Sequence, residues 1–174
     1  DKASDFTAIL TKIKGLKPDA IFFGGMDGQG APLARQMRSL GLTSRLMGGD
    51  GIHTAEFMKL AGPAAENVVA SLPGRPLADL PQGADFKTRF EQKYGRIQLY
   101  APYCYDAMQV LARAMQRAGS TEPAKVIAEL RNTDHQGVTA RIRFDDKGDL
   151  RAGAITVYQV ANGDWQKLKT VESE

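Results

Sequence analysis

Short apolar runs alternate with amphipathic segments through the first 72 residues. The runs at 20–23, 46–47 and 68–72 are typical of strands in a parallel sheet, and the first is continuous enough to predict a strand covered on both faces. Apolar residues at helical spacing predict helices over 6–14, 32–40 and 54–60, each followed by a glycine. This alternation at short spacing predicts βαβ units and a parallel sheet.

The pattern changes at residues 73–81, where three prolines exclude both a continuing helix and a central strand. We interpret this stretch as a crossover between structural units. Helices are predicted over 85–94, 101–118 and 123–130. In the tail, residues 140–144 alternate as a half-buried strand does, and 145–149 form a turn. A strand over 155–160 leads into Asn162-Gly163, the preferred two-residue hairpin signal, so 165–168 should pair back against it.

Composition narrows the class of protein. The chain of 174 residues suits one domain or parts of two. Its formal charge is only +3 and its Lys and Arg residues are scattered, which disfavours nucleic-acid binding. No apolar stretch approaches the roughly 20 residues of a membrane span. The single cysteine, Cys104, excludes an internal disulfide, and we interpret it as a small buried residue of a helix.

Two aspartates in glycine-rich turns are the strongest chemical signal. Asp27 follows the strand predicted at 20–23, and Asp50 follows the one at 46–47. Loops at the carboxyl ends of parallel strands face one crevice, which is where open α/β sheets bind ligands. Two carboxylates on that rim predict a ligand with a positive group. The alternative is structural, because aspartate also stabilises turns and caps helices.

Other chemistry finds little support. The sequence has no dinucleotide fingerprint, no phosphate-binding lysine loop and no metal-ligand spacing, so we expect no cofactor and no metal. The acidic turn at 145–149 lacks the calcium-loop pattern. Neither the serines nor Cys104 has a base nearby in the sequence, so we expect that the protein is not an enzyme. The alternative is an α/β enzyme whose catalytic residues come from distant parts of the chain. Tyr100, which precedes a predicted helix, either packs between helices or forms a wall of the crevice.

Several segments together resemble a known family. They are Asp5-Phe6-Thr7-Ala8-Ile9-Leu10, 18–25 (PDAIFFGG), Arg35-Gln36-Met37 with Leu40-Gly41, 100–103 (YAPY) with 105–107 (YDA), and Phe144-Asp145 with Lys147-Gly148-Asp149. In this order they resemble the periplasmic branched-chain amino acid binding proteins, the leucine/isoleucine/valine-type receptors of ABC importers. The resemblance covers nearly the whole chain.

The resemblance implies an α/β fold of the type I periplasmic binding protein class. Two doubly wound, Rossmann-like lobes are joined by three crossovers and close on a ligand. It also implies that the chain is the C-terminal half of a longer protein, so the fold is incomplete. Residues 1–72 with the hairpin in 153–174 correspond to part of lobe two, and 73–152 to the returning part of lobe one. We expect exposed sheet edges through which the chain self-associates.

The resemblance also implies a site and a role. Asp50 falls where the family places an acidic residue that binds the α-ammonium group of an amino acid. Tyr100 falls where an aromatic residue lines the side-chain pocket, and Met26 replaces a tyrosine of the best-known members; Asp27 is its neighbour. The implied function is periplasmic delivery of an amino acid to an ABC transporter permease, without a cofactor. The alternative is a ligand-sensing domain of a regulator or receptor with the same fold.

Overall fold

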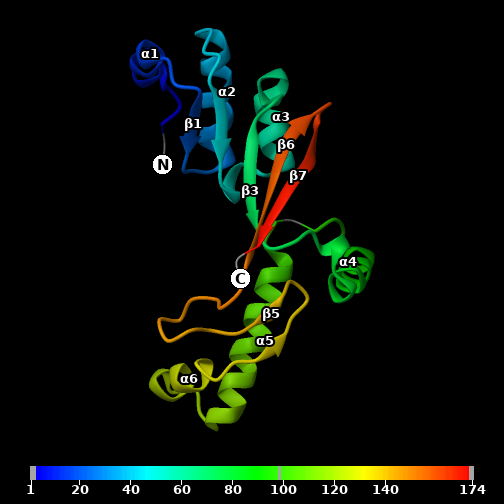
Figure 1. Cartoon of the computed structure of the whole chain (residues 1–174). Coiled ribbons are helices and arrows are strands. Elements are labelled where there is room, and N and C mark those ends of the chain that lie inside the picture. The colour runs from blue at the N-terminus through cyan, green and yellow to red at the C-terminus, as the bar shows by residue number, and fades with distance from the viewer. Residues whose placement is uncertain (1–2, 98, 173–174) are drawn as a thin grey trace. The chain divides into compact units, whose positions relative to one another are not determined.

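The computed structural model describes residues 3–97 and 99–172 (Figure 1). The chain divides into two compact units, one of Asp1–Pro73 with Thr156–Thr170 and one of Gly74–Ile155 with Val171–Glu174. The assignment of 1–72 with 153–174 and of 73–152 to the lobes of a longer protein stays a prediction, and residues 1–2, 98 and 173–174 of those ranges lie outside the described part.

A five-stranded sheet organises the first unit (Figure 1). Its strands are β1 (Ala20–Phe23), β2 (Arg45–Gly48), β3 (Val69–Pro73), β6 (Ala154–Ala161) and β7 (Asp164–Glu172), in the order β1-β2-β3-β6-β7. β1, β2 and β3 are parallel, with Phe23 opposite Gly48 and Gly48 opposite Ala70. The predicted parallel sheet of the first 72 residues is therefore confirmed.

The connecting helices are α1 (Thr7–Leu16), α2 (Asp27–Ser39) and α3 (Ala55–Ala61), with 3₁₀ turns η1 (Asp50–Ile52) and η2 (Gly62–Ala65). Thr54 caps α3, because its hydroxyl accepts a hydrogen bond from the Phe57 amide at 2.9 Å. Helices and sheet enclose one apolar core, whose buried members are Leu10, Ala31, Leu33, Ala34, Met37, Leu46, Ile52, Phe57, Ala61, Ala65, Val68, Ala70 and Val160.

The prediction that β1 is covered on both faces is wrong for this chain. Ile21 and Phe23 pack against the core, whereas Ala20 is exposed and Phe22 is 70% exposed. β1 is the first strand of the sheet order and pairs only with β2 among the described strands. The apolar run is therefore a half-buried edge strand here, and one large aromatic side chain faces solvent.

The predicted hairpin is confirmed. Exactly two residues separate β6 from β7, and both have positive φ, 55° at Asn162 and 77° at Gly163. Those angles belong to the type I′ turn that Asn-Gly favours, because its twist matches that of the strands. Near the turn, the Val160 amide donates a hydrogen bond at 2.9 Å to the carbonyl of Val68, the residue before β3. This bond joins the hairpin to the parallel part of the sheet.

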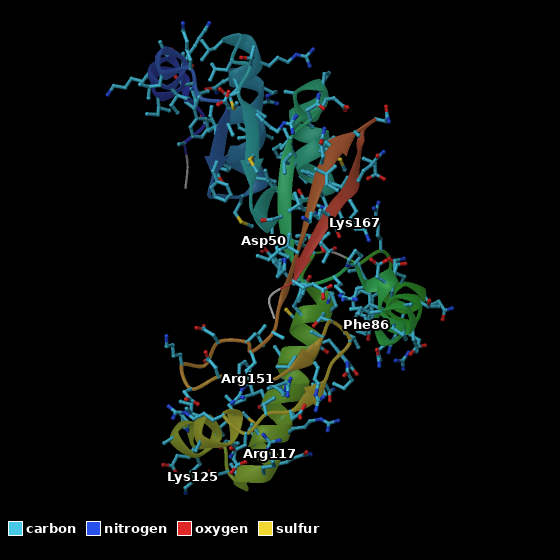
Figure 2. All side chains as sticks on the ribbon, viewed as in Figure 1. Asp50, Phe86, Arg117, Lys125, Arg151 and Lys167 are labelled. Carbon is cyan, nitrogen blue, oxygen red and sulfur yellow. The ribbon has the colours of Figure 1, made fainter. Side chains whose placement is uncertain are left out.

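The second unit is mainly helical. It contains η3 (Leu77–Asp79), α4 (Pro81–Tyr94), α5 (Ala101–Ala118), α6 (Pro123–Leu130) and a short antiparallel pair, β4 (His135–Gln136) with β5 (Arg141–Ile142). The predicted α5 and α6 match in their bounds. α4 begins earlier than predicted because Pro81, taken as part of the break, occupies its first turn. Phe86 of α4 contacts Tyr105 of α5, and Arg117 of α5 pairs with Glu129 of α6 at 3.1 Å. Figure 2 labels Phe86 and Arg117.

One stripe of α5 faces the interior of the second unit. Its buried residues are Pro102, Asp106, Val110 and Ala114, spaced four apart. Asp106 is the charged member of this stripe, and it is only 2% exposed. Cys104 lies off this stripe and is exposed, so its interpretation as a buried residue is wrong.

Candidate functional site

Two loops leave the same edge of the sheet in the first unit. Phe23 and Gly48 are register partners at the carboxyl ends of β1 and β2, so the loops that follow, 24–26 and 49–51, start side by side. Asp27 follows the first loop as the opening residue of α2. Asp50, labelled in Figure 2, lies in the second loop as the opening residue of η1. The carboxyl-end rim of a parallel sheet is the usual ligand edge of an open α/β fold.

These loops touch. A Cβ placed on Gly51 would lie 2.5 Å from the carbonyl oxygen of Gly25 and 2.8 Å from the sulfur of Met26. Ile52, fully buried, fixes η1 from below, because a Cβ on Gly48 or Gly30 would collide with its side chain. The glycines therefore permit the close approach of one loop to the other.

Asp50 is half-buried, and its carbonyl accepts a hydrogen bond from the His53 amide at 3.0 Å. The neighbouring Gly49 has extended backbone angles, with φ at −84°. A Cβ on Gly24 or Gly49 would meet no atom of the described residues within 4 Å. The rim therefore has free space beside Gly24 and Gly49, whereas Gly51 packs tightly against the other loop.

Asp27 uses both carboxylate oxygens within the chain. One accepts a hydrogen bond from the Gly28 amide at 2.8 Å, and the other accepts from the Thr54 hydroxyl at 3.0 Å. Thr54 follows the loop of Asp50 and caps α3. Asp27 therefore connects the two rim loops, a role that neither a helix cap nor a simple turn describes.

The remaining predicted site residues divide between the units. Met26 flanks Asp27 and is half exposed on the same rim. Tyr100 belongs to the second unit and directly precedes α5. Its carbonyl accepts a hydrogen bond from the Cys104 amide, and its side chain is half exposed. The structure thus brings Met26, Asp27 and Asp50 together.

An aromatic cluster behind the rim was not predicted. The imidazole of His53 stacks on Trp165 with ring centroids 4.6 Å apart and contacts Tyr158 at 4.5 Å. Burial lowers the pKa of His53 to about 4, although a hydrogen bond to its own backbone and the charge of Asp164 act in the opposite direction. The indole of Trp165 donates to the Thr54 carbonyl at 3.3 Å, from a position 111 residues away. No local signal in the sequence could have predicted that Trp165 contacts His53 and Thr54.

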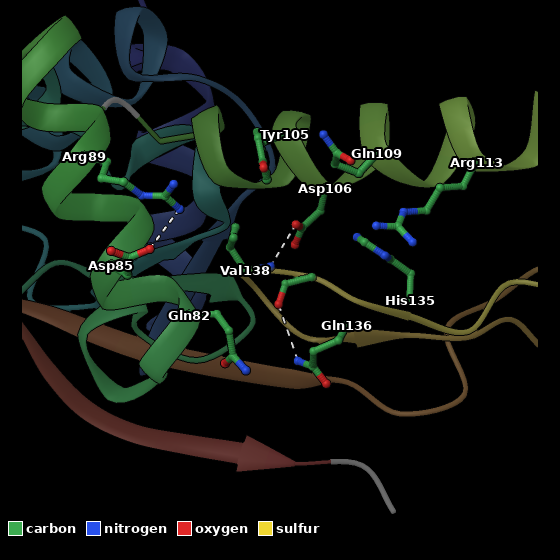
Figure 3. A pocket seen from close by; sticks show the side chains of 11 residues that line it. Gln82, Asp85, Arg89, Tyr105, Asp106, Gln109, Arg113, His135, Gln136 and Val138 are labelled. Carbon is green, nitrogen blue, oxygen red and sulfur yellow. Dashed lines mark hydrogen bonds and ion pairs between the residues drawn. The ribbon is translucent and has the colours of Figure 1, made fainter. Parts of the chain in front are cut away.

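A pocket of about 280 Å³ in the second unit is the other candidate (Figure 3). Its lining combines polar and charged side chains of α4, α5 and β4, namely Gln82, Asp85, Arg89, Tyr105, Asp106, Gln109, Arg113, His135 and Gln136, with Gly137 and Val138.

The buried acid of this pocket is already engaged. The Asp106 carboxylate accepts hydrogen bonds from the Val138 and Thr139 amides at 2.8 Å and from the Thr139 hydroxyl at 2.5 Å. Arg89 pairs with Asp85 at 2.8 Å. Asp106 therefore anchors the 137–139 turn on α5, and the pocket offers no comparable acid for a ligand. Among residues 3–97 and 99–172, no group of three His, Cys, Asp or Glu residues could hold a metal ion.

Residues 1–164 match the family model described as periplasmic binding protein. The chain belongs to this family. It is 33% identical over 170 residues to the leucine-, isoleucine-, valine-, threonine- and alanine-binding protein of Pseudomonas aeruginosa, covering 95% of the chain and 43% of that protein. The chain therefore spans less than half the length of this curated relative.

Solved structures show the fold of the family. A leucine-binding protein from Thermotoga maritima superposes with a TM-score of 0.87 at 29% identity, over 98% of the chain and 49% of that protein. A branched-chain amino acid transporter substrate-binding protein from Streptococcus pneumoniae, solved with isoleucine, gives 0.80 at 25% identity, over 99% and 50%. The predicted α/β fold of the periplasmic binding protein class is confirmed, and the chain represents about half of it. In the described part of the chain, no helix has the length and apolarity that crossing a membrane requires.

Proposed function

We propose that the protein containing this chain is a periplasmic receptor that binds an amino acid and delivers it to an ABC transporter permease. Asp50 carries the proposal, because it is an acidic residue on the carboxyl-end rim of a sheet in a chain of the periplasmic binding protein family. Relatives named for leucine, isoleucine and valine favour a branched-chain or similar ligand. The protein works by binding, not by chemical conversion.

In this proposal the Asp50 carboxylate accepts hydrogen bonds from the α-ammonium group of the ligand. Such charge-assisted bonds are shorter and stronger than neutral ones, and removal of water strengthens them further. The open space at Gly24 and Gly49 allows a ligand to approach the backbone of both loops. Met26, half exposed on the same rim, is proposed to contact the ligand side chain.

The test is calorimetry of the full-length protein against a panel of amino acids. Asp50→Ala should cost roughly 2–5 kcal/mol of binding free energy, which raises Kd roughly 30-fold or more. Asp19→Ala is the matched control: it removes the same charge just before β1, at the strand end remote from the rim. An affinity that survives Asp50→Ala within a factor of two would refute the assignment.

A further inference from the structure

The link between Asp27 and Thr54 points to a role for Asp27 that the resemblance does not supply. Both aspartates lie on the rim, and the Asp27 carboxylate accepts a hydrogen bond at 3.0 Å from the hydroxyl of Thr54, which follows the opposite loop. The inference rests on the proposed function, because it concerns how Asp50 is held for the ligand.

Thr54 is fixed in three further ways. Its hydroxyl accepts from the Phe57 amide at 2.9 Å, so its one hydroxyl proton is left for Asp27. Its own amide donates to the Ile52 carbonyl at 2.9 Å, and its carbonyl accepts from the Trp165 indole. Thr54 is therefore a rigid point between η1 and α3, and Asp27 is attached to it.

The segment from Asp50 to Thr54 is short and held along its length. The His53 amide donates to the Asp50 carbonyl at 3.0 Å, and the His53 ring stacks on Trp165 of β7. Ile52 is fully buried beneath the segment. A displacement of Thr54 must therefore move Asp50 or break one of these contacts.

We propose that Asp27 is a positioning residue: through its bond to Thr54 it sets the loop of Asp50 relative to the loop of Met26. The other oxygen of Asp27, bonded to the Gly28 amide at 2.8 Å, keeps the carboxylate oriented toward Thr54. Asp50 is then the residue that receives the ammonium group, and Asp27 acts through it. A bond to a charged partner is strong enough to hold such an arrangement.

The experiment measures amino acid affinity of the full-length protein by calorimetry. Asp27→Ala should weaken binding roughly tenfold or more, whereas Thr54→Ser, which keeps both the donor and the cap, should bind as the wild type does. Asp19→Ala again controls for loss of charge. The decisive variant is the double change: in the Asp50→Ala background, Asp27→Ala should have no further effect on affinity. An additional loss there would mean that Asp27 contributes to binding by a route other than Asp50 and would overturn the proposal.

A second measurement does not depend on the ligand. Asp27→Ala should accelerate hydrogen exchange at the amides of His53 and Thr54, which bond the Asp50 and Ile52 carbonyls. Unchanged exchange at both amides would overturn the positioning role even if affinity falls. If the wild-type protein binds no amino acid while exchange rises as expected, the proposed function fails and the coupling of the loops stands.

Discussion

Gly49 and Gly51, the glycines on either side of Asp50, should respond oppositely to the same added methyl group. In Gly51→Ala the new Cβ would lie 2.5 Å from the carbonyl oxygen of Gly25, and this atom belongs to the backbone. That is about 1 Å closer than an ordinary van der Waals contact, so one of the loops must move. In Gly49→Ala the Cβ meets no described atom within 4 Å, and the φ of −84° suits alanine.

The magnitudes follow from two opposing effects. Crowding of this kind costs about 1–3 kcal/mol. Replacing glycine by alanine in a compatible conformation stabilises by about 0.4–1 kcal/mol, because the unfolded chain loses freedom. Gly51→Ala should therefore destabilise the first unit by about 1–2 kcal/mol, and Gly49→Ala should stabilise it slightly.

Urea unfolding measures the difference. Trp165 is the single tryptophan of the chain and stacks on His53, two residues beyond Gly51, so its emission reports on this part of the first unit. With a slope of about 1–3 kcal/mol per molar urea, the midpoints of the two variants should differ by about 1 M. Equal midpoints, or a Gly51→Ala variant as stable as the wild type, would show that the loops do not pack as described.

Two further predictions concern pH and association. Because burial lowers the folded pKa of His53 to about 4 from 6.5, its contribution to stability is complete above pH 6.5 and is lost as the pH falls toward 4. Wild type should lose about 2 kcal/mol over this range relative to His53→Phe, measured by urea unfolding at both ends; parallel losses would contradict the assignment. Phe22 is 70% exposed on the edge strand β1, so the 174-residue chain should associate with rising concentration in light scattering, and Phe22→Lys should reduce this without loss of stability. A wild-type chain that stays monomeric at all concentrations would refute the second prediction.

Local signals were sufficient for most of the elements. Asn162-Gly163 predicted the hairpin because positive φ at two successive positions is a property of those residue types. Thr54 predicted the start of α3 because its hydroxyl reaches an amide only three residues away. Pro81 misled the prediction for α4, since proline breaks a helix interior but is favoured in the first turn.

Tertiary contacts decided the features that the sequence did not reveal. Phe22 belongs to a run that is typical of a covered strand, yet its exposure depends on what packs against its face of β1. Asp106 lies on an otherwise apolar stripe, and its burial is stabilised by amides more than 30 positions along the chain. Periodicity alone assigns such a residue to the solvent face.

The two rim aspartates also show that local sequence signals and tertiary contacts determine different features of one site. Both follow a strand, both have glycines beside them, and the sequence offered each a ligand role and a structural role. What separates them is Thr54: its hydroxyl lies 3.0 Å from Asp27, and its position is fixed by α3 and by Trp165 of the hairpin. A carboxylate that joins two loops contributes to an ammonium site by holding geometry, because an electrostatic site depends on preorganised partners. If Asp50 provides the charge and Asp27 the geometry, Asp27→Asn, which keeps one acceptor oxygen for the Thr54 hydroxyl, should weaken amino acid affinity less than Asp27→Ala does. Asp50→Asn, which removes the charge, should lose about as much affinity as Asp50→Ala, and calorimetry of the full-length protein measures both.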